Sequence, residues 1–277
     1  MRIGFIGAGF VAFSLSKYLN DKYHNVVGIY SKDIKDAMEL SSFSYVECYS
    51  KLVDLIYDCD ALFLTINDDE IKNVVNELIK LKVNNKILIH TSGSKSSLEF
   101  NELNDNNYCY SLHPIYAFNS KYESYKNLDK VYFTLEGNEK YTDDIKSLFP
   151  DHVKVIDRNE KAKYHLGCVF ISNLVCGLIN EGLDIFKSIG IDDLSIFNPL
   201  IENNINNILN KGPVDALTGP VVRNDYDTIK AHLENVSDKD KKIYIYLSYI
   251  LINMAKNKKD NDYEKLIKLL EDNDGNC

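Results

Sequence analysis

Two stretches of the sequence place hydroxyl and imidazole side chains directly after apolar runs, where a catalytic site could form. The first, His90-Thr91-Ser92-Gly93-Ser94, follows the apolar run 86–90 and carries hydroxyls that could reach a cofactor amide or a substrate oxygen. Ligands of open α/β sheets bind outside the carboxyl ends of the strands, so Ser92 is a candidate for orienting a substrate carbonyl. The alternative is a serine-rich cap for the next helix, which applies more to Ser94 than to Ser92.

The second stretch, Ser111-Leu112-His113-Pro114, presents a histidine at the end of another apolar run. Pro114 fixes the chain and holds the residue before it in an extended conformation. Histidine titrates near neutral pH, so His113 could give a proton to an alkoxide formed when hydride reaches a carbonyl carbon. The alternative is a hydrogen-bonded histidine with a structural role only.

A later segment, Thr218-Gly219-Pro220-Val221-Val222-Arg223-Asn224-Asp225, offers a cation for an acidic substrate. Asp225 is placed to cap the helix that follows. Arg223 lies in the preceding turn, where its guanidinium could hold a carboxylate through two hydrogen bonds. His232 shares a helical face with Thr228, and it is as consistent with packing or with the surface as with a site.

Further candidates lie on one long predicted helix, residues 160–188. His165 and Asn173 are eight residues apart, which on a straight helix separates them by about 12 Å along the axis. They cannot touch, but they could flank a substrate and a nicotinamide. Asn173 could instead be a satisfied polar group at a helix interface.

A glycine-rich turn near the start of the chain indicates what these side chains would face. Gly7, Gly9 and Ala12 have the G-x-G-x-x-A spacing between a predicted strand, residues 2–6, and a predicted helix, residues 11–19. Such a turn lets the backbone approach a pyrophosphate, and the helix aims its first amides at the phosphates. The residues expected to bind the dinucleotide here are Gly7, Ala8, Gly9, Phe10 and Val11.

The end of the second strand favours NADPH over NADH. An NAD-type domain generally has an Asp or Glu at this position, but here the strand ends in Ser31 and Lys32. Ser31 can donate a hydrogen bond to a 2′-phosphate and Lys32 can pair with its charge. Asp33, one residue later, could still serve a 2′-hydroxyl.

Alternating strands and helices predict an α/β fold with a Rossmann-type, doubly wound parallel sheet in residues 1–157. From residue 158 to residue 277 the pattern changes to an all-α domain that should close over the sheet edge. The expected strands are residues 2–6, 25–30, 61–66, 86–90, 108–112, 131–135 and 153–156, and the expected helices of the second domain are 160–188, 195–211, 225–235, 238–257 and 263–271.

Composition narrows the class of protein. The net charge of −9 without a basic stripe argues against nucleic acid as a partner. The most apolar run, 166–179, is too short for a bilayer and contains Asn173, and no signal peptide precedes the first strand. The six cysteines are scattered without metal-ligand spacing, so we expect reduced thiols, no metal and a cytoplasmic protein; they are Cys48, Cys59, Cys109, Cys168, Cys176 and Cys277.

Taken together, these motifs resemble a bacterial family in which a Rossmann-like domain precedes a helical domain long labelled as of unknown function. The resemblance covers nearly the whole chain and is carried by Gly7-x-Gly9-x-x-Ala12, His90-Thr91-Ser92-Gly93, Leu112-His113-Pro114-Ile115-x-x-Phe118, Tyr164-His165 with Asn173, and Leu217-Thr218-Gly219-Pro220-x-x-Arg223-x-Asp225-x-x-Thr228-x-x-x-His232. Members are similar to pyrroline-carboxylate reductase and 6-phosphogluconate dehydrogenase, and some are alternative, PanG-type ketopantoate reductases. The chain departs from this pattern at Asn224, where glycine is commoner, and at Val169, where better-known ketopantoate reductases have a lysine.

The resemblance implies an NADPH-dependent reductase of a small 2-oxo acid, with ketopantoate as the expected substrate and pantoate as the product. In this reading His113 or His165 protonates or hydrogen-bonds the developing alkoxide, Ser92 and Asn173 orient the carbonyl, and Arg223 holds the carboxylate. Two alternatives stay open: an imine reductase of the pyrroline-carboxylate kind, and a sensor that binds NADPH without turnover. Apolar faces such as residues 243–254 predict a homodimer formed through the helical domain.

Overall fold

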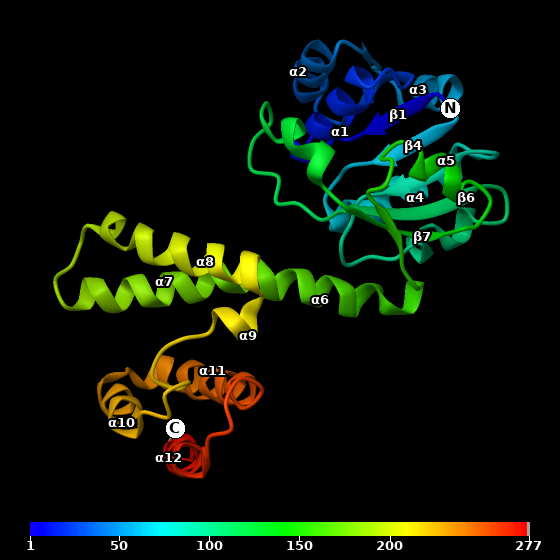
Figure 1. The fold of residues 1–277 in the computed structure, drawn as a ribbon. Helices are drawn as coiled ribbons and strands as arrows, with labels where there is room; N and C mark the ends of the chain where they lie inside the picture. Colours follow the sequence, from blue (N-terminus) through cyan, green and yellow to red (C-terminus); the bar gives the residue numbers. More distant parts are fainter. Residues whose placement is uncertain (276–277) are drawn as a thin grey trace. The chain divides into compact units, whose positions relative to one another are not determined.

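A computed structural model describes residues 1–275, and the chain divides into two compact units, Met1–Asn173 and the residues from Leu174 onward. The first unit contains the sheet, and the described part of the second is helical (Figure 1). Helix α6 (Lys161–Ile171) belongs to the first unit, whereas the sequence interpretation ended the first domain at Asp157. Cys277, expected to be a reduced thiol, lies outside the described residues.

The strands of the first unit form one eight-stranded sheet in the order β3-β2-β1-β4-β5-β6-β7-β8. Strands β1 to β6 are parallel, as predicted, but β7 runs antiparallel to β6 because a loop with a 3₁₀ helix, η2 (Ser124–Lys130), returns the chain instead of an α-helical crossover. The strands are β1 (Ile3–Ile6), β2 (Val26–Tyr30), β3 (Glu47–Cys48), β4 (Ala61–Leu64), β5 (Ile87–His90), β6 (Tyr108–Pro114), β7 (Phe133–Gly137) and β8 (Val153–Val155). Strand β3, with two residues and no apolar run, was not predicted.

Helices cover both faces of this sheet, which explains why its central strands are apolar without alternation. All residues of β1, β4 and β5 are buried. One face packs against α1 (Phe10–Asp21), α2 (Ile34–Ser44), η2 and α5 (Thr142–Lys146). The other packs against α3 (Leu52–Asp58), α4 (Asp68–Lys80) and the 3₁₀ helix η1 (Ser97–Leu103).

The single helix predicted over residues 160–188 is wrong, because the chain breaks it at Ser172. Helix α6 ends at Ile171 and α7 (Asn173–Ser188) begins two residues later. The Ser172 hydroxyl donates to the carbonyl of Cys168 at 2.6 Å, four residues back, and a hydroxyl that competes in this way for the helix carbonyls bends a helix.

The same stretch corrects the expectation that no run is long enough for a bilayer. Taken across the break, the stretch Arg158–Ser188 has the length and apolar composition of a membrane span. None of the most apolar part of this stretch is buried. Length and composition alone do not identify a membrane segment, since helices that pack against other protein surfaces pass the same test.

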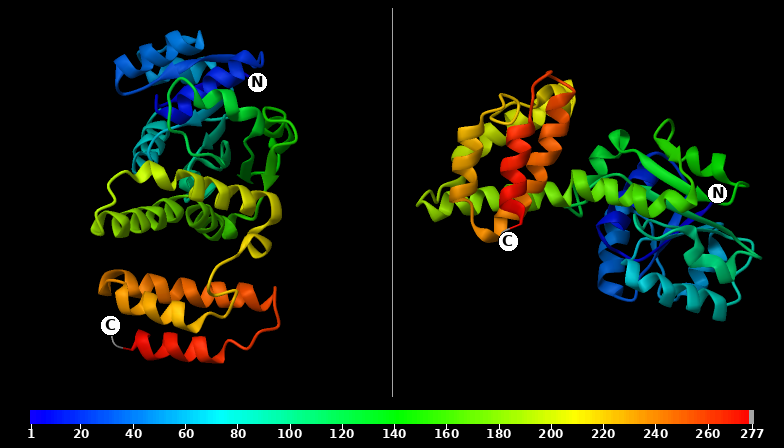
Figure 2. Two further views of the ribbon diagram at one scale, coloured as in Figure 1. Left: turned by 60° about the vertical axis from the view of Figure 1, so that its left-hand side comes forward. Right: turned by 90° about the horizontal axis from the view of Figure 1, so that it is seen from below.

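In the second unit, α7 and α8 (Asn198–Lys211) lie side by side as a helical hairpin (Figures 1 and 2), and the rings of Phe186 and Phe197 stack at 3.7 Å. The chain passes through η4 (Leu194–Phe197) before α8 and through α9 (Pro213–Ala216) after it. A separate core joins α10 (Tyr226–Asn235), α11 (Asp238–Lys256) and α12 (Glu264–Asp274), with Ile229, Ile245 and Leu266 buried among them.

Candidate functional site

The glycine turn after β1 has the geometry that a dinucleotide requires. Gly7 has φ +100°, and a Cβ there would lie 2.6 Å from Ile66 Cγ2 and 2.7 Å from the carbonyl oxygen of Thr65, so only glycine fits. At Gly9, the residue that precedes α1, an added Cβ would meet the Thr65 oxygen at 3.9 Å and nothing nearer among the described residues. The protein does not fill the space in front of Gly9, which leaves it for a phosphate on the helix amides.

A cavity of about 260 Å³ opens at this turn and contains most of the predicted cofactor residues. Strands β1 and β4 are neighbours here although they are not consecutive, which is the switch point where open α/β sheets bind ligands. Phe10 is exposed, and Val11 lines an adjoining cavity. The predicted residues that line the first cavity are Gly7, Ala8, Gly9, Ser31 and Lys32.

The residues at the end of β2 have partners that the sequence did not indicate. The Nζ of Lys32 lies 2.6 Å from Oε2 of Glu70, which belongs to the first turn of α4. Asp33 accepts the amide hydrogen of Lys35 on Oδ1 and caps α2, so one of its two carboxylate oxygens is engaged in the helix. Its service to a ribose hydroxyl stays a prediction.

The second cavity, of about 350 Å³, brings together three of the five predicted catalytic residues. It shares Ile66 and Asn67 with the cavity at the glycine turn, so the two cavities adjoin. Ser92, His113 and His165 line it together with Val11. A nicotinamide that extends from the glycine turn past Asn67 would therefore enter a space bounded by two imidazoles.

The two histidines meet over Gly93. A Cβ on Gly93 would lie 2.4 Å from Nδ1 of His165 and 2.8 Å from Nε2 of His113, so any larger residue would displace both rings. The rings are nearly perpendicular, at 87°, with their centroids 5.8 Å apart. Sequence reasoning noted Gly93 only as part of a motif, because its importance depends on side chains that are distant along the chain.

Tyr164 fixes the orientation of His113. Its hydroxyl lies 2.7 Å from Nδ1 of His113, and burial raises the pKa of the phenol, so it stays protonated. When the hydroxyl donates to Nδ1, the imidazole proton is on Nε2, over Gly93. His113 can then donate a hydrogen bond into the cavity.

His113 differs from the expectation that it titrates near neutral pH. Burial, followed by the nearby Lys161 ammonium, lowers the pKa of His113 to about 4. The imidazole is therefore neutral at physiological pH. A neutral imidazole is a hydrogen-bond donor and a weak acid, not a cationic acid.

Lys161 is a buried cation beside this pair that the predicted set omitted. Its side chain is 2% exposed, and among the described residues its Nζ has no hydrogen-bond partner. Burial lowers the pKa of Lys161 to about 8. It precedes Tyr164 and His165 by three and four residues, a spacing that places all three on one face of α6 and could have revealed it.

Ser92 lines the cavity, but its hydroxyl is already engaged. It donates to Oδ2 of Asp68 at 2.8 Å and accepts the amide hydrogen of Lys95 at 3.0 Å. Ser94 also donates to Asp68, at 2.8 Å. The role of Ser92 in orienting a carbonyl stays a prediction, and the carboxylate of Asp68, which the sequence interpretation did not single out, lines the same cavity.

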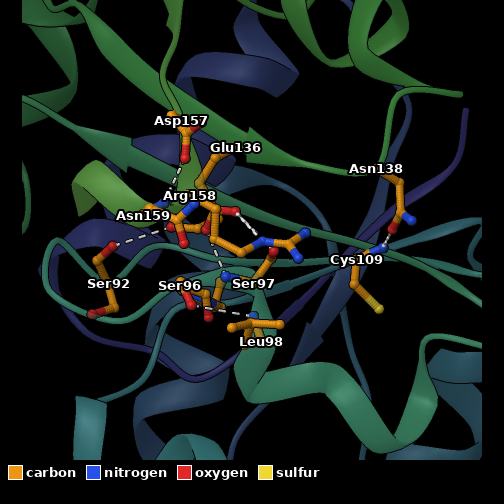
Figure 3. A network of polar contacts seen from close by, with 12 residues as sticks. Ser92, Ser96, Ser97, Leu98, Cys109, Glu136, Asn138, Asp157, Arg158 and Asn159 are labelled. Atoms are coloured by element: carbon orange, nitrogen blue, oxygen red, sulfur yellow. Dashed lines mark hydrogen bonds and ion pairs between the residues drawn. The ribbon is translucent and has the colours of Figure 1, made fainter. Parts of the chain in front are cut away.

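Glu136 contacts the segment that follows Gly93 and the segment that leads to His165 (Figure 3). Its buried carboxylate accepts the amide hydrogen of Ser97 at 2.5 Å, the hydroxyl of Ser97 at 2.8 Å and the Nε hydrogen of Arg158 at 3.2 Å. Ser97 follows the Gly93 loop, and Arg158 begins the 3₁₀ helix η3 (Arg158–Glu160) that leads into α6. One carboxylate on β7 thus fixes the loop and the helix that bring Gly93 and His165 together.

The remaining two predicted residues are not part of this cluster of the first unit. Asn173 is exposed, and its Oδ1 accepts a hydrogen bond from the Ser172 hydroxyl at 3.0 Å. Arg223 belongs to the second unit, where it pairs with Asp225 at 3.6 Å. Asp225 caps α10 as predicted, and Asn224 adopts φ +56°, which asparagine tolerates well. The proposed roles of Asn173 and Arg223 stay predictions.

Comparisons with known proteins agree with this two-part organisation. Residues 2–93 match the family described as NADP oxidoreductase coenzyme F420-dependent, and residues 131–250 match the domain of unknown function DUF2520. The first part of the chain is therefore similar to NADP oxidoreductases and the later part to DUF2520 domains. The match supports NADP(H) as the cofactor, and the matched region includes both the glycine turn and Gly93.

Solved structures support the fold of the chain. A protein of Thermotoga maritima is 23% identical with a TM-score of 0.72, and the match covers 92% of this chain and 99% of that one. A protein of Bacteroides fragilis assigned as an NADP oxidoreductase is 22% identical with a TM-score of 0.71, over 91% and 98% of the two chains. An imine reductase of Myxococcus stipitatus, solved with NADP⁺, is 10% identical with a TM-score of 0.62, over 98% and 100%. No curated protein sequence matches the chain.

Proposed function

We propose that this protein reduces the ketone of a small 2-oxo acid with NADPH, and that 2-dehydropantoate (ketopantoate) is the substrate to test first. The observation that supports the proposal is the convergence of His113 Nε2 and His165 Nδ1 over Gly93, in a cavity that adjoins the one at the glycine turn. A carbonyl carbon placed against the nicotinamide in this cavity would have its oxygen within reach of an imidazole donor.

The chain's own residues supply polarisation and a proton. The cofactor supplies hydride to the carbonyl carbon. His113 donates from Nε2 to the carbonyl oxygen, which stabilises the charge that develops there. As Nε2 gives its proton to the alkoxide, the Tyr164 hydroxyl can protonate Nδ1 through the 2.7 Å contact, and the phenol later recovers a proton from solvent.

Carboxylate recognition is assigned in this proposal to Arg223. Its guanidinium is exposed and its contact with Asp225 is long, at 3.6 Å, which supports the proposal. A charged anchor remote from the ketone can position the reacting carbon, because binding energy spent there lowers the barrier elsewhere.

One observation favours a second candidate, reduction of a cyclic imine. Because the pKa of His113 is lowered to about 4, no cationic histidine is offered at position 113 at neutral pH. A protonated imine already carries its proton and needs no strong acid, and the Asp68 carboxylate that lines the cavity would favour a cation.

The test is NADPH oxidation by the full chain, followed by absorbance, with ketopantoate, other 2-oxo acids and cyclic imines. We expect turnover of a 2-oxo acid, a large rise in KM for Arg223→Ala and a fall in kcat for His113→Ala. Turnover of imines alone would favour the second candidate. NADPH binding without oxidation by any of these substrates would favour a sensor.

We also propose a cytoplasmic homodimer, formed through α7 and α8. None of the residues of these two helices, all of which the structure describes, is buried, and their large apolar side chains are open to solvent. A second copy would cover them, since exposed apolar patches of this kind mark interfaces. The exposed side chains include Leu174, Leu178, Ile185, Leu200 and Leu209. A monomer by light scattering, or a requirement for detergent, would contradict this.

A further inference from the structure

The cation expected to bind the 2′-phosphate is already neutralised. Lys32 Nζ and Glu70 Oε2 are 2.6 Å apart, and the pair raises the pKa of Lys32 and lowers that of Glu70. Glu70 is held in place on its other oxygen, where Asn73 Nδ2 donates at 3.3 Å. The contact joins the end of β2 to the first turn of α4, and both side chains line the 260 Å³ cavity.

The charge around this pair is otherwise negative. Asp36 and Glu77 line the same cavity as Glu70, and Lys32 is the only lysine or arginine among the described residues that line it. Asp36 is paired with Lys121 at 3.8 Å, so the carboxylate that a 2′-phosphate bound to Lys32 would meet at short range is that of Glu70. A 2′-hydroxyl carries no charge and would not be repelled by it.

Glu70 and a 2′-phosphate compete for one ammonium. An anion that binds Lys32 must either displace Glu70 or share the cation with it. If the phosphate shares the ammonium, the Glu70 carboxylate repels it, and if it displaces Glu70, the 2.6 Å ion pair is lost. Either route weakens NADPH and leaves NADH nearly unaffected.

We infer that Glu70 is a specificity-determining residue of the cofactor site, which limits the preference for NADPH over NADH by occupying Lys32. The inference rests on NADP(H) binding at the glycine turn and is independent of the proposed substrate. Glu70 thus acts on the 2′-phosphate end of the cofactor, which is remote from the hydride of the nicotinamide.

The experiment measures dissociation constants of NADPH and NADH by calorimetry for the full-length wild type, Glu70→Gln and Glu102→Gln. Glu102 is the matched control, because it forms an exposed ion pair with Lys72 of the same helix, α4, but does not line the cavity. We expect Glu70→Gln to tighten NADPH about 3- to 10-fold and to change NADH less than about 2-fold, with both constants unchanged in Glu102→Gln. In a Lys32→Ala background, the gain for NADPH should shrink, because no cation is left to release.

Equal tightening of both cofactors by Glu70→Gln would overturn the inference, since it would reflect general charge only. Weaker NADPH binding would also overturn it, because Glu70 would then be orienting Lys32 toward the phosphate. Failure of the wild type to bind NADPH at all would instead refute the cofactor assignment. None of these measurements requires a substrate, so a wrong substrate class leaves the result intact.

Discussion

The imidazoles of His113 and His165 stand at right angles with their centroids 5.8 Å apart, and free nitrogens of both point to the space over Gly93. His113 comes from the end of β6 and His165 from α6, so the pair exists only when the sheet edge and the helix are packed together. This relationship gives the candidate site its chemistry.

Gly93→Ala should reduce catalysis without preventing cofactor binding. The new methyl would lie 2.4 Å from His165 and 2.8 Å from His113, so one ring must move, and a misplaced catalytic group costs on the order of 100-fold in kcat. NADPH affinity should hold, since Gly93 does not line the cavity at the glycine turn. Steady-state kinetics and calorimetry check this. Gly167→Ala in α6 is the control, because its Cβ would meet nothing within 4 Å among the described residues; equal kcat losses in both variants would contradict the explanation.

Tyr164→Phe should lower kcat about 10- to 100-fold with little change in the KM for NADPH. The substitution removes the hydroxyl that lies 2.7 Å from His113 Nδ1, so the ring loses both its preferred tautomer and its proton source. Steady-state kinetics with both substrates varied would separate the two constants. A kcat equal to that of the wild type would show that Tyr164 has no part in the proton path.

Stability should fall in acid because two buried histidines are neutral in the folded protein. Burial is the main cause that lowers the pKa of His113, and also that of His90, to about 4, against about 6.5 in an unfolded chain. Between these values the unfolded chain binds more protons, so the free energy of unfolding is greatest above pH 6.5 and decreases as the pH falls toward 4. Each histidine should cost about 2 kcal/mol between pH 7.5 and 5.

Urea unfolding at these two pH values measures the effect. His113→Asn should reduce the difference between the two free energies of unfolding by about 2 kcal/mol, because asparagine does not titrate. An undiminished difference in this variant would show that His113 titrates normally in the folded protein.

Glu136→Gln should destabilise the first unit by about 1–3 kcal/mol, since the buried carboxylate accepts charge-assisted hydrogen bonds from Ser97 and Arg158 that an amide satisfies poorly. The histidine pair should loosen as well, so kcat should fall together with the free energy of unfolding. Urea denaturation measures the stability. Glu102→Gln, at an exposed ion pair, should change the free energy of unfolding by less than about 0.5 kcal/mol. An equal loss of stability in both variants would show that the buried hydrogen bonds of Glu136 stabilise the protein no more than an exposed ion pair does.

Local sequence patterns predicted several elements well. The apolar runs predicted β1, β2, β4, β5, β6 and β8 near their observed bounds. Strands that are covered on both faces are continuous apolar segments, so they stand out in the sequence. The G-x-G-x-x-A spacing predicted the turn at Gly7, since only glycine tolerates φ +100° beside Ile66. Asp225 was predicted as a helix cap from its position alone, because a cap depends on neighbours within three residues.

The sequence by itself thus determined the nucleotide-binding fold, the glycine turn and the set of His113, His165 and Ser92 as candidates. Only the tertiary structure decided that Gly93 lies beneath both imidazoles, that Glu70 holds Lys32, that burial keeps His113 neutral and that Ser172 breaks the long helix. The physical reason is the distance along the chain between the residues that decide each feature. Strands, turns and caps are fixed by residues close in sequence, whereas contacts, desolvation and charge at a site depend on side chains that meet only after the chain has packed.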